Sequence, residues 1–266
     1  MSDGDTFRRG RRGFADHFSR DSSAYAKFRP TYPPALFEWL ATLPVRRSVA
    51  WDCGTGTGQA ATLLTPYFTM VVASDASRAQ IRAADRSRGV RYFTALGESC
   101  ALAPGRVDLV TVAQALHWID RDRFYRELDR VTAPGGALAV WSYGIFRSTP
   151  DIDAVIGRFY RHTVGAYWPA ERVHVESGYR TIDIPIAEVT SPAFSIEGRL
   201  TLSELVGFIR TWSAVGRYMA AVKTDPIVEL ERELHAVWGD PRTPHLMVWP
   251  LSVRAGRWLG STPAAA

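Results

Sequence analysis

The sequence predicts a doubly wound α/β fold, in which helices cover both faces of a mostly parallel, seven-stranded sheet. Between residues 48 and 141, short apolar runs alternate with longer helical patterns, which is typical of βαβ units. These runs are apolar without a polar face, as expected for parallel strands buried between two helix layers. After residue 141 the pattern changes to aromatic-rich helices and two alternating segments. This change predicts a helical cap inserted after the fifth strand.

The five parallel strands are predicted from apolar runs that end near polar residues or turns. They cover residues 48–51, 70–75, 90–94, 107–112 and 137–141.

The helices between these strands are predicted over residues 57–66, 77–84 and 121–131. In the last of these, apolar residues recur at helical spacing, and Asp120 stands where an N-cap is expected. The turn Pro134-Gly135-Gly136 is predicted to lead into the fifth strand.

The second half of the chain is predicted to form the cap and the sheet edge. Residues 151–165 and 201–239 have helical patterns, whereas residues 182–198 and 244–256 alternate like antiparallel strands. We therefore expect four segments. They are a disordered basic tail (1–19), a cofactor-binding core (20–145), a helical cap with the substrate region and an edge strand (146–240), and a last strand with a C-terminal tail (241–266).

The composition is that of an ordinary globular protein, with 46% hydrophobic and 22% charged residues. No apolar run approaches the roughly 18 residues that a membrane span requires, and no secretory signal begins the chain. Only Cys53 and Cys100 are present, and the six histidines are scattered, so neither a disulfide framework nor a metal site is expected. These features predict a cytoplasmic protein without a metal.

The chain is basic, with a net charge of +5 and a pI of about 9.4. Part of this charge lies near the start, at Arg8, Arg9, Arg11 and Arg12. Such a run is either a nucleic-acid-binding arm or a solvated tail. The remaining arginines are interspersed with acids, so we favour the tail and do not expect a nucleic-acid partner. Anionic small substrates fit this charge, and no pattern indicates an oligomeric state.

The stretch DCGTGTGQA, residues 52–60, follows the first predicted strand and leads into a helix. Glycines at such a strand end allow a tight turn and a close approach of backbone to ligand. Dinucleotide-binding proteins have the spacing G-x-G-x-x-G and place a pyrophosphate on the helix N-terminus. In this chain the spacing is G-x-G-x-G, with Gln59 in the place of the third glycine. Asp52 adds a carboxylate that would repel a pyrophosphate.

A ligand with positive charge and no phosphate suits this loop better. S-adenosylmethionine carries an ammonium and a sulfonium, so the motif favours it over a nicotinamide dinucleotide. Asp75 ends the second predicted strand, where an acid can accept hydrogen bonds from both ribose hydroxyls. The alternative for Asp75 is the N-cap of the following helix.

The sequence resembles the class I S-adenosylmethionine-dependent methyltransferases in three stretches. These are DCGTGTGQ (52–59), SDAS (74–77) and RVTAPGG (130–136). YAKFRPTYP (25–33), AQALHWID (113–120) and RTWSAVGRY (210–218) are similar to the branch that includes trans-aconitate methyltransferases. The resemblance implies a Rossmann-like methyltransferase fold. It also implies methyl transfer from S-adenosylmethionine to a small-molecule acceptor, with a carboxylate as one candidate.

The resemblance also implies which residues bind the cofactor. The glycine loop would wrap the methionine part, and an N-terminal helix would fold over it. Gly97 stands where the family usually has alanine, so the adenine contact there is expected from the backbone. The implied cofactor-binding residues are Tyr25, Arg29, Asp52, Gly54, Thr55, Gly56, Gly58, Asp75, Ala76, Gln80, Glu98, Gln114 and His117.

Methyl transfer depends mainly on alignment of donor and acceptor. A carboxylate acceptor needs no base, whereas a hydroxyl, amine or carbon acceptor can need one with a pKa near the working pH. His117 is the candidate for this catalytic role, and its alternative is a structural or donor-binding role.

The acceptor pocket is expected in the cap. The candidates are aromatic residues that can line a pocket and an arginine that can bind a carboxylate. Core packing, or a surface ion pair for the arginine, is the alternative for each. The candidates are Tyr143, Trp168, Arg210 and Trp212.

Two other enzymatic functions remain open from the sequence. One is an NAD(P)-dependent oxidoreductase, against which Asp52 and Gln59 argue. The other is a methyltransferase that acts on RNA or another macromolecule through the arginine tail. A third alternative is a non-catalytic descendant that keeps the fold.

Overall fold

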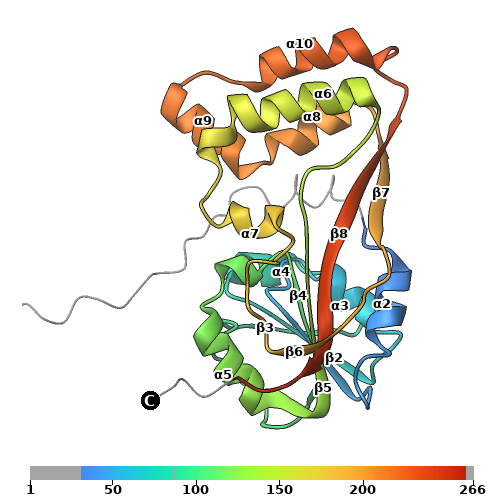
Figure 1. The fold of residues 1–266 in the computed structure, drawn as a ribbon, viewed down its shortest axis with the longest axis vertical. Helices are drawn as coiled ribbons and strands as arrows, with labels where there is room; N and C mark the ends of the chain where they lie inside the picture. Colours follow the sequence, from blue (N-terminus) through green and yellow to red (C-terminus); the bar gives the residue numbers. More distant parts are fainter. Residues whose placement is uncertain (1–30, 87, 262–266) are drawn as a thin grey trace, which may run out of the picture.

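The computed structural model describes residues 31–86 and 88–261. The predicted basic tail, Tyr25 and Arg29 lie outside the described residues. Within them, eight strands form one sheet, and the path along it runs β3-β2-β1-β4-β5-β8-β6, with β7 paired to β8 (Figure 1). The first five strands are parallel, and β8 is antiparallel to β5 and β6. The predicted doubly wound, mostly parallel fold is confirmed.

The strands lie close to their predicted positions. Their bounds are β1 Val49–Cys53, β2 Met70–Asp75, β3 Arg91–Thr94, β4 Val107–Ala113, β5 Thr132–Tyr143, β6 Ile186–Val189, β7 Ser195–Leu200 and β8 His245–Trp258.

Two predictions of strand boundaries were wrong. The segment 182–198 was expected to be one strand, but it contains all of β6 and part of β7, separated by a stretch that includes Pro192. Proline lacks the N–H that a strand interior uses. Residues 134–136 were expected to be a turn before β5, but they lie inside it. The strand stays continuous because Gly135, with φ +76°, forms an irregularity where the register against β4 shifts.

The helices of the core pack on the two faces of the sheet. Their bounds are α2 Pro34–Leu40, α3 Gln59–Leu64, α4 Arg78–Ala83 and α5 Arg121–Val131. The short 3-10 helix η1, Leu116–Trp118, follows β4. Successive residues of β5 alternate between two hydrophobic clusters, one beneath α2 and α3 and one beneath α5. Asp120 caps α5 as predicted, because its carboxylate accepts a hydrogen bond from the backbone N–H of Arg123.

The cap consists of short helices between β5 and β8 (Figure 1). The predicted helical stretch 201–239 is divided into three by the extended backbone at Trp212 and by Lys223, whose φ is +64°. The shortest α-helix of the cap, α7, lies between the other cap helices and the sheet. The bounds are α6 Pro150–Arg158, η2 Phe159–Thr163 (a π-helix), η3 Gly165–Tyr167, α7 Arg172–Glu176, α8 Leu202–Arg210, α9 Ser213–Val222 and α10 Ile227–Trp238. None of the helices in the described ranges is long and apolar enough to cross a bilayer.

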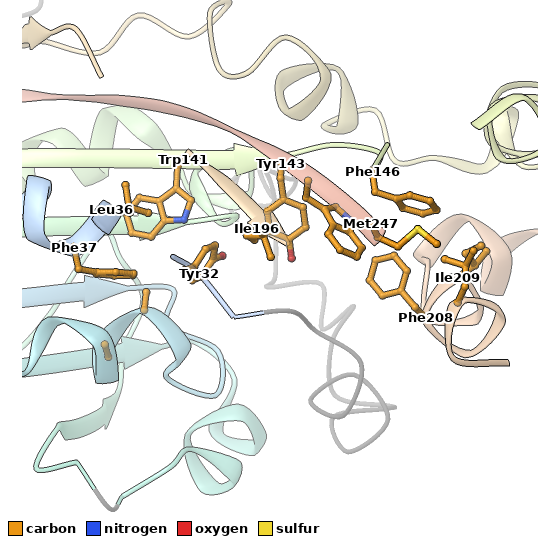
Figure 2. Packing of buried hydrophobic residues seen from close by; sticks show 14 of the residues in the cluster. Tyr32, Leu36, Phe37, Trp141, Tyr143, Phe146, Ile196, Phe208, Ile209 and Met247 are labelled. Carbon is orange, nitrogen blue, oxygen red and sulfur yellow. The ribbon is translucent and has the colours of Figure 1, made fainter. Parts of the chain in front are cut away.

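A single long strand joins the cap to the core. The first half of β8 pairs with β7 and the second half pairs with β5 and β6. Beside it, aromatic side chains continue from the sheet into the cap (Figure 2). The ring centroids of Tyr32 and Trp141 are 5.6 Å apart, and Trp249 lies 5.4 Å from Phe146 and 5.5 Å from Phe208. Because these rings form one cluster, we expect the cap and the core to unfold together.

Replacing Trp249, which is only 1% exposed, tests this coupling. We expect Trp249→Ala to lower the free energy of unfolding by about 3–5 kcal/mol, since it leaves a large cavity. Urea denaturation followed by circular dichroism should show one transition at a lower midpoint. Val228→Ala, on the exposed face of α10 (67% exposed), is the control and should change stability by less than about 0.5 kcal/mol. Two separate transitions would contradict the coupling.

Candidate active site

The glycine loop between β1 and α3 has a backbone that only glycine adopts easily. Gly54, Gly56 and Gly58 have φ values of +69°, +57° and +91°, in the region that L side chains rarely enter. A Cβ at Gly54 would lie 2.6 Å from the Cβ of Ala115, and a Cβ at Gly58 would lie 2.1 Å from the hydroxyl of Tyr92. The motif therefore brings backbone, not side chains, to the carboxyl end of the sheet.

Asp52 lies beneath this loop and is fully buried. Its Oδ1 accepts a hydrogen bond of 2.7 Å from the Thr111 hydroxyl of β4, and its Oδ2 accepts one of 2.5 Å from the Thr55 hydroxyl of the loop. The backbone N–H of Ala61, in the first turn of α3, also donates to the carboxylate. Asp52 thus joins β1, β4, the loop and α3, and its charge lies under the loop rather than on its surface.

Burial raises the pKa of Asp52 to about 6, although the hydrogen bonds from Thr55 and Thr111 act in the opposite direction. A buried carboxylate is costly to ionise unless donors or a cation compensate it. A cation bound on the other side of the loop would favour the ionised form.

Asp75, at the end of β2, holds the loop from the other side. Its Oδ2 accepts from the backbone N–H of Gly56 at 2.8 Å, and its Oδ1 accepts from the N–H of Ser77 at 2.7 Å. The N-cap of α4 is Ser77, whose hydroxyl accepts from the N–H of Gln80. The N-cap alternative for Asp75 is therefore wrong. Each oxygen of a carboxylate can accept more than one hydrogen bond, so ribose hydroxyls can add to these contacts.

The predicted adenine side is formed by residues that follow β2 and β3. Gln80 is buried, and its Oε1 lies 4.0 Å from the position of a Cβ at Gly56; Ala76 is half-buried beside Asp75. The carboxylate of Glu98 accepts from the backbone N–H of Asp120 at 2.8 Å. The structure explains the glycine at 97, because a Cβ there would lie 2.8 Å from the Sγ of Cys53.

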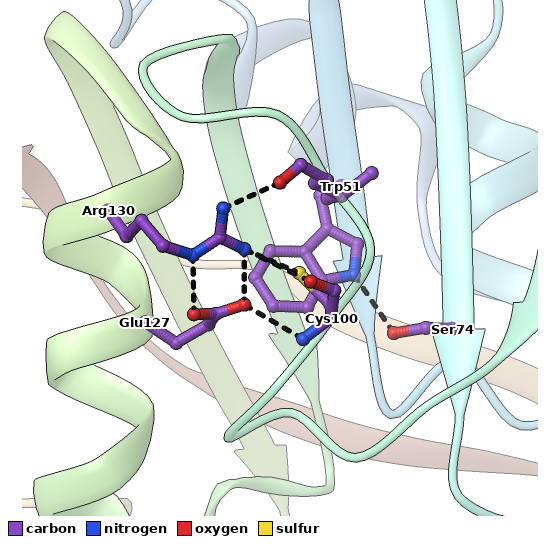
Figure 3. Close-up of polar contacts among 6 residues, drawn as sticks. Trp51, Ser74, Cys100, Glu127 and Arg130 are labelled. Carbon is purple, nitrogen blue, oxygen red and sulfur yellow. Dashed lines mark hydrogen bonds and ion pairs between the residues drawn. The ribbon is translucent and has the colours of Figure 1, made fainter.

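A pair of residues on α5, which the sequence analysis missed, holds the segment that carries Glu98 (Figure 3). Arg130 donates to the carbonyls of Cys100 and Leu102 at 3.0 and 2.7 Å. Glu127 accepts from the N–H of Cys100 at 2.8 Å and pairs with Arg130 at 2.6 Å. The hydrogen bond from Arg130 lowers the pKa of Glu127 to about 2. The spacing of the two residues on one helix face is visible in the sequence, but their partners are not.

Gln114 follows β4 in a left-handed conformation, with φ +55°. Its backbone N–H donates to the carbonyl of Trp141 and its Nε2 donates to the carbonyl of Tyr143, both at 2.9 Å. Strained backbone of this kind persists only when its surroundings hold it, and it is frequent at functional sites. The side-chain amide thus links the ends of β4 and β5. The ring of Tyr143 is buried against Tyr32.

His117 lies in η1, and its Nδ1 is 2.9 Å from the hydroxyl of Tyr179. That hydroxyl also accepts hydrogen bonds from the backbone N–H groups of Leu116 and His117. Its one proton is therefore donated to Nδ1, and Nε2 carries the proton of the neutral ring. Burial, followed by the charges of Arg172 and His174, lowers the pKa of His117 to about 3. A base of such low pKa is weak at neutral pH, so this geometry favours the structural or donor-binding alternative over the general-base prediction.

Comparisons with known proteins find methyltransferases. The family model for the methyltransferase domain matches residues 51–140. A Dictyostelium discoideum protein named as a methyltransferase is 32% identical over 225 residues, covering 83% of this chain and 86% of that protein. A solved structure described as a type II methyltransferase from Anaeromyxobacter dehalogenans has a TM-score of 0.82 and 44% identity, covering 88% of this chain and 100% of that one. The chain belongs to the methyltransferase family.

Membership confirms three of the predictions. The chain is an enzyme of the methyltransferase class, its Rossmann-like methyltransferase fold is shown, and S-adenosylmethionine is its cofactor. The residues present fit this cofactor, because a Cβ at Gly56 would meet no protein atom closer than Oε1 of Gln80 at 4.0 Å, so the loop leaves open space there. No group of three or more potential metal ligands occurs in the part of the chain that the structure describes.

Tyr179 fixes the cap of the methyltransferase to its core, and the sequence analysis missed it. This residue is fully buried and has a φ of +60°. Its hydroxyl accepts hydrogen bonds from backbone N–H groups of η1. The guanidinium of Arg254 in β8 donates to the carbonyls of Tyr179 and Ile182 at 3.0 and 2.6 Å and pairs with Glu188 at 2.9 Å. No sequence signal marks Tyr179, since its partners are far along the chain.

Two of the predicted substrate residues, Trp168 and Trp212, lie together, and Arg210 lies apart from them. The ring centroids of Trp168 and Trp212 are 5.7 Å apart, and Tyr160 lies 4.9 and 5.7 Å from them. Arg210 instead pairs with Asp225 at 2.7 Å on the surface. This contact is the surface ion pair that was the alternative to a substrate-binding role. The arginine at this cluster is Arg172, whose Cζ lies 4.6 Å from the centroid of the Trp168 ring. The sequence analysis missed Arg172.

Gly58→Ala tests the need for an open loop. We expect S-adenosylhomocysteine to bind at least about tenfold more weakly in calorimetry, because the added methyl group must displace Tyr92 and strain the backbone. Gly105→Ala is the matched control, since Gly105 also has a positive φ (+63°) but a Cβ there meets nothing within 4 Å. This control should lose some stability but keep its affinity. Equal affinities for the two variants would argue against the need for glycine at position 58.

The raised pKa of Asp52 predicts a pH dependence of ligand binding. Its ionised form increases as pH rises through about 6. If the ammonium of S-adenosylhomocysteine binds that form, affinity should rise about tenfold between pH 5 and pH 7.5. The free energy of unfolding should change with pH in the opposite direction. The raised pKa of Asp52 stabilises the free protein at low pH, by up to roughly 3 kcal/mol, and this contribution is lost as pH rises through 6.

Asp52→Asn should reduce the pH dependence of ligand affinity and of stability. Calorimetry measures the first and urea denaturation the second, between pH 5 and pH 7.5. Asp108→Asn is the control, because Asp108 is also a buried carboxylate but binds the backbone of Ser48 and Val49 at the opposite end of the sheet. It should keep the pH dependence of binding. A wild-type affinity that does not change between pH 5 and 7.5 would refute this role of Asp52.

Proposed function

We propose that the enzyme transfers the methyl group of S-adenosylmethionine to a small-molecule acceptor, with carboxylic acids as the first class to test. The observation that carries this proposal is the glycine loop held between the carboxylates of Asp52 and Asp75, which suits a cationic ligand without phosphate.

Apart from Tyr25 and Arg29, the residues proposed to hold the cofactor lie at or after the ends of four strands. Gly54, Thr55, Gly56 and Gly58 would surround the methionine part, above the charge of Asp52. The carboxylate of Asp75 would accept from the ribose hydroxyls. The other proposed contacts are Ala76, Gln80 and Glu98 at the adenine, and Gln114, His117, Tyr25 and Arg29 at the methionine end.

The sulfonium of the bound cofactor supplies an activated methyl group and a good leaving group. The protein then has to orient the acceptor and exclude water, which can contribute about 7–11 kcal/mol to lowering the barrier. A carboxylate acceptor needs no proton removed. The neutral ring of His117, with its proton on Nε2, is suited to donate a hydrogen bond at this end of the site and not to accept a proton.

The position of the cap favours a small acceptor over a macromolecule. Strand β5 leads directly into the cap, and since β1 and β4 are parallel to it, the carboxyl ends of these strands face the cap helices (Figure 1). The resemblance to the trans-aconitate methyltransferase branch supports a carboxylate acceptor. The arginine tail on which the RNA alternative depends lies outside the described residues. Cytoplasmic localisation stays a prediction from the cysteine content.

Ligand binding and an acceptor screen test this proposal. We expect calorimetry to show heat with S-adenosylhomocysteine and none with NADH. With labelled S-adenosylmethionine, we expect label transfer to carboxylic acids, trans-aconitate among them, in preference to phenols and amines. Binding of NADH alone would exclude the proposed function. Transfer only to phenols or amines would exclude the carboxylate class.

A deletion of residues 1–12 tests the macromolecular alternative. We expect unchanged activity on small acids. RNA binding that is weakened by salt and lost on deletion would instead favour the RNA methyltransferase.

A further inference from the structure

Arg172 is an arginine held over aromatic rings on the inner side of the cap. Its guanidinium lies 4.6 Å from the centroid of the Trp168 ring and 5.6 Å from that of Tyr160. Its Nε donates to the Tyr160 hydroxyl at 2.8 Å, and that hydroxyl donates to Glu176 at 2.6 Å. Only 20% of the Arg172 side chain is exposed. This arrangement fixes the plane of the guanidinium.

Tyr160 reaches this cluster from η2, the π-helical turn that continues α6. π-Helical turns are rare in proteins, and those that occur are often found at functional sites. The turn places Tyr160 against both Trp168 and Trp212. The backbone irregularity thus serves to present an aromatic side chain to the arginine.

Several hydrogen-bond donors of the cluster have no acceptor among the described residues. The indole Nε1 of Trp168 is buried and has no hydrogen-bond partner there. For Arg172, the hydrogen bond and the ion pair found in the same part of the chain both involve Nε, with Tyr160 at 2.8 Å and Glu176 at 3.9 Å. Buried donors without acceptors are costly, so the cluster is suited to a ligand that brings acceptor oxygens.

The cluster lies next to the end of the site at which the methyl group is expected. Arg172 begins α7, and the turn after α7 carries Tyr179, whose hydroxyl binds His117 at 2.9 Å. Arg254 holds the backbone of the same turn. The charge of Arg172 also contributes to the lowered pKa of His117, which agrees with their proximity. Contacts within the protein therefore hold the first residue of α7 and the turn that follows the helix.

We propose that Arg172 and the indole N–H of Trp168 bind the carboxylate of an aromatic or unsaturated acid, whose flat hydrocarbon part packs against Tyr160 and Trp212. A guanidinium matches a carboxylate with two parallel hydrogen bonds, and aromatic rings favour a planar partner. The proposal rests on the proposed methyltransferase function and names its acceptor class. Glu176, close to the guanidinium, favours a singly charged carboxylate over a phosphate dianion.

Binding of a matched acid and amide tests this site. With the protein saturated with S-adenosylhomocysteine, we expect calorimetry to give cinnamate an affinity at least about tenfold higher than that of cinnamamide. Arg172→Met should lower the affinity for cinnamate by about the same factor and leave cinnamamide within about twofold. Trp168→Phe, which removes the N–H and keeps an aromatic ring, should cost cinnamate about threefold to tenfold.

Arg210→Met is the matched control, because Arg210 belongs to the same cap but forms a surface ion pair with Asp225; its affinities should not change. If Arg172→Met does not fold, Arg172→Lys keeps the charge without the planar fork and should lose about threefold or more for cinnamate. Equal affinities for acid and amide, an acid preference that survives loss of Arg172, or tighter binding of phenyl phosphate would overturn the proposal. In each of these cases intact binding of S-adenosylhomocysteine leaves the methyltransferase function standing, whereas its absence in the wild type refutes that function.

Discussion

The glycine loop is held in an open conformation by two carboxylates that bind it from below and from one side. Asp52 accepts hydrogen bonds from Thr55 of the loop and Thr111 of β4, while Asp75 accepts from the N–H of Gly56. These contacts hold the loop in a conformation with positive φ values at its three glycines, which places its backbone at the carboxyl end of the sheet. Two negative charges beside a glycine-rich loop are unfavourable for a pyrophosphate and favourable for a cationic methyl donor.

The acceptor side depends on how the cap is fixed to this core. The long strand β8 pairs with β5 and β6 below and with β7 above, and the aromatic cluster at Trp249 fills the space beside it. The turn at Tyr179 binds η1. Because both attachments consist of contacts within the protein, the Arg172 cluster is pre-organised, which lowers the entropic cost of binding.

Much of the fold could be predicted from sequence, since buried parallel strands and glycine motifs leave local signals. The range of α5, its cap at Asp120 and the loop at residues 52–60 are examples. Residues whose roles depend on distant contacts could not be predicted. Arg172 and Arg210 are equally plausible carboxylate ligands in the sequence, and only packing separates a guanidinium over Trp168 from a surface ion pair. His117 was identified, but Tyr179, whose hydroxyl contacts its Nδ1, was not.

A crystal structure of the enzyme with S-adenosylhomocysteine would test the central claim most directly. We expect the ribose hydroxyls within hydrogen-bonding distance of the Asp75 carboxylate and the homocysteine along residues 54–58. We also expect the sulfur to face the space between His117 and Arg172. A ligand bound away from the glycine loop, or with its sulfur turned from the cap, would contradict the account.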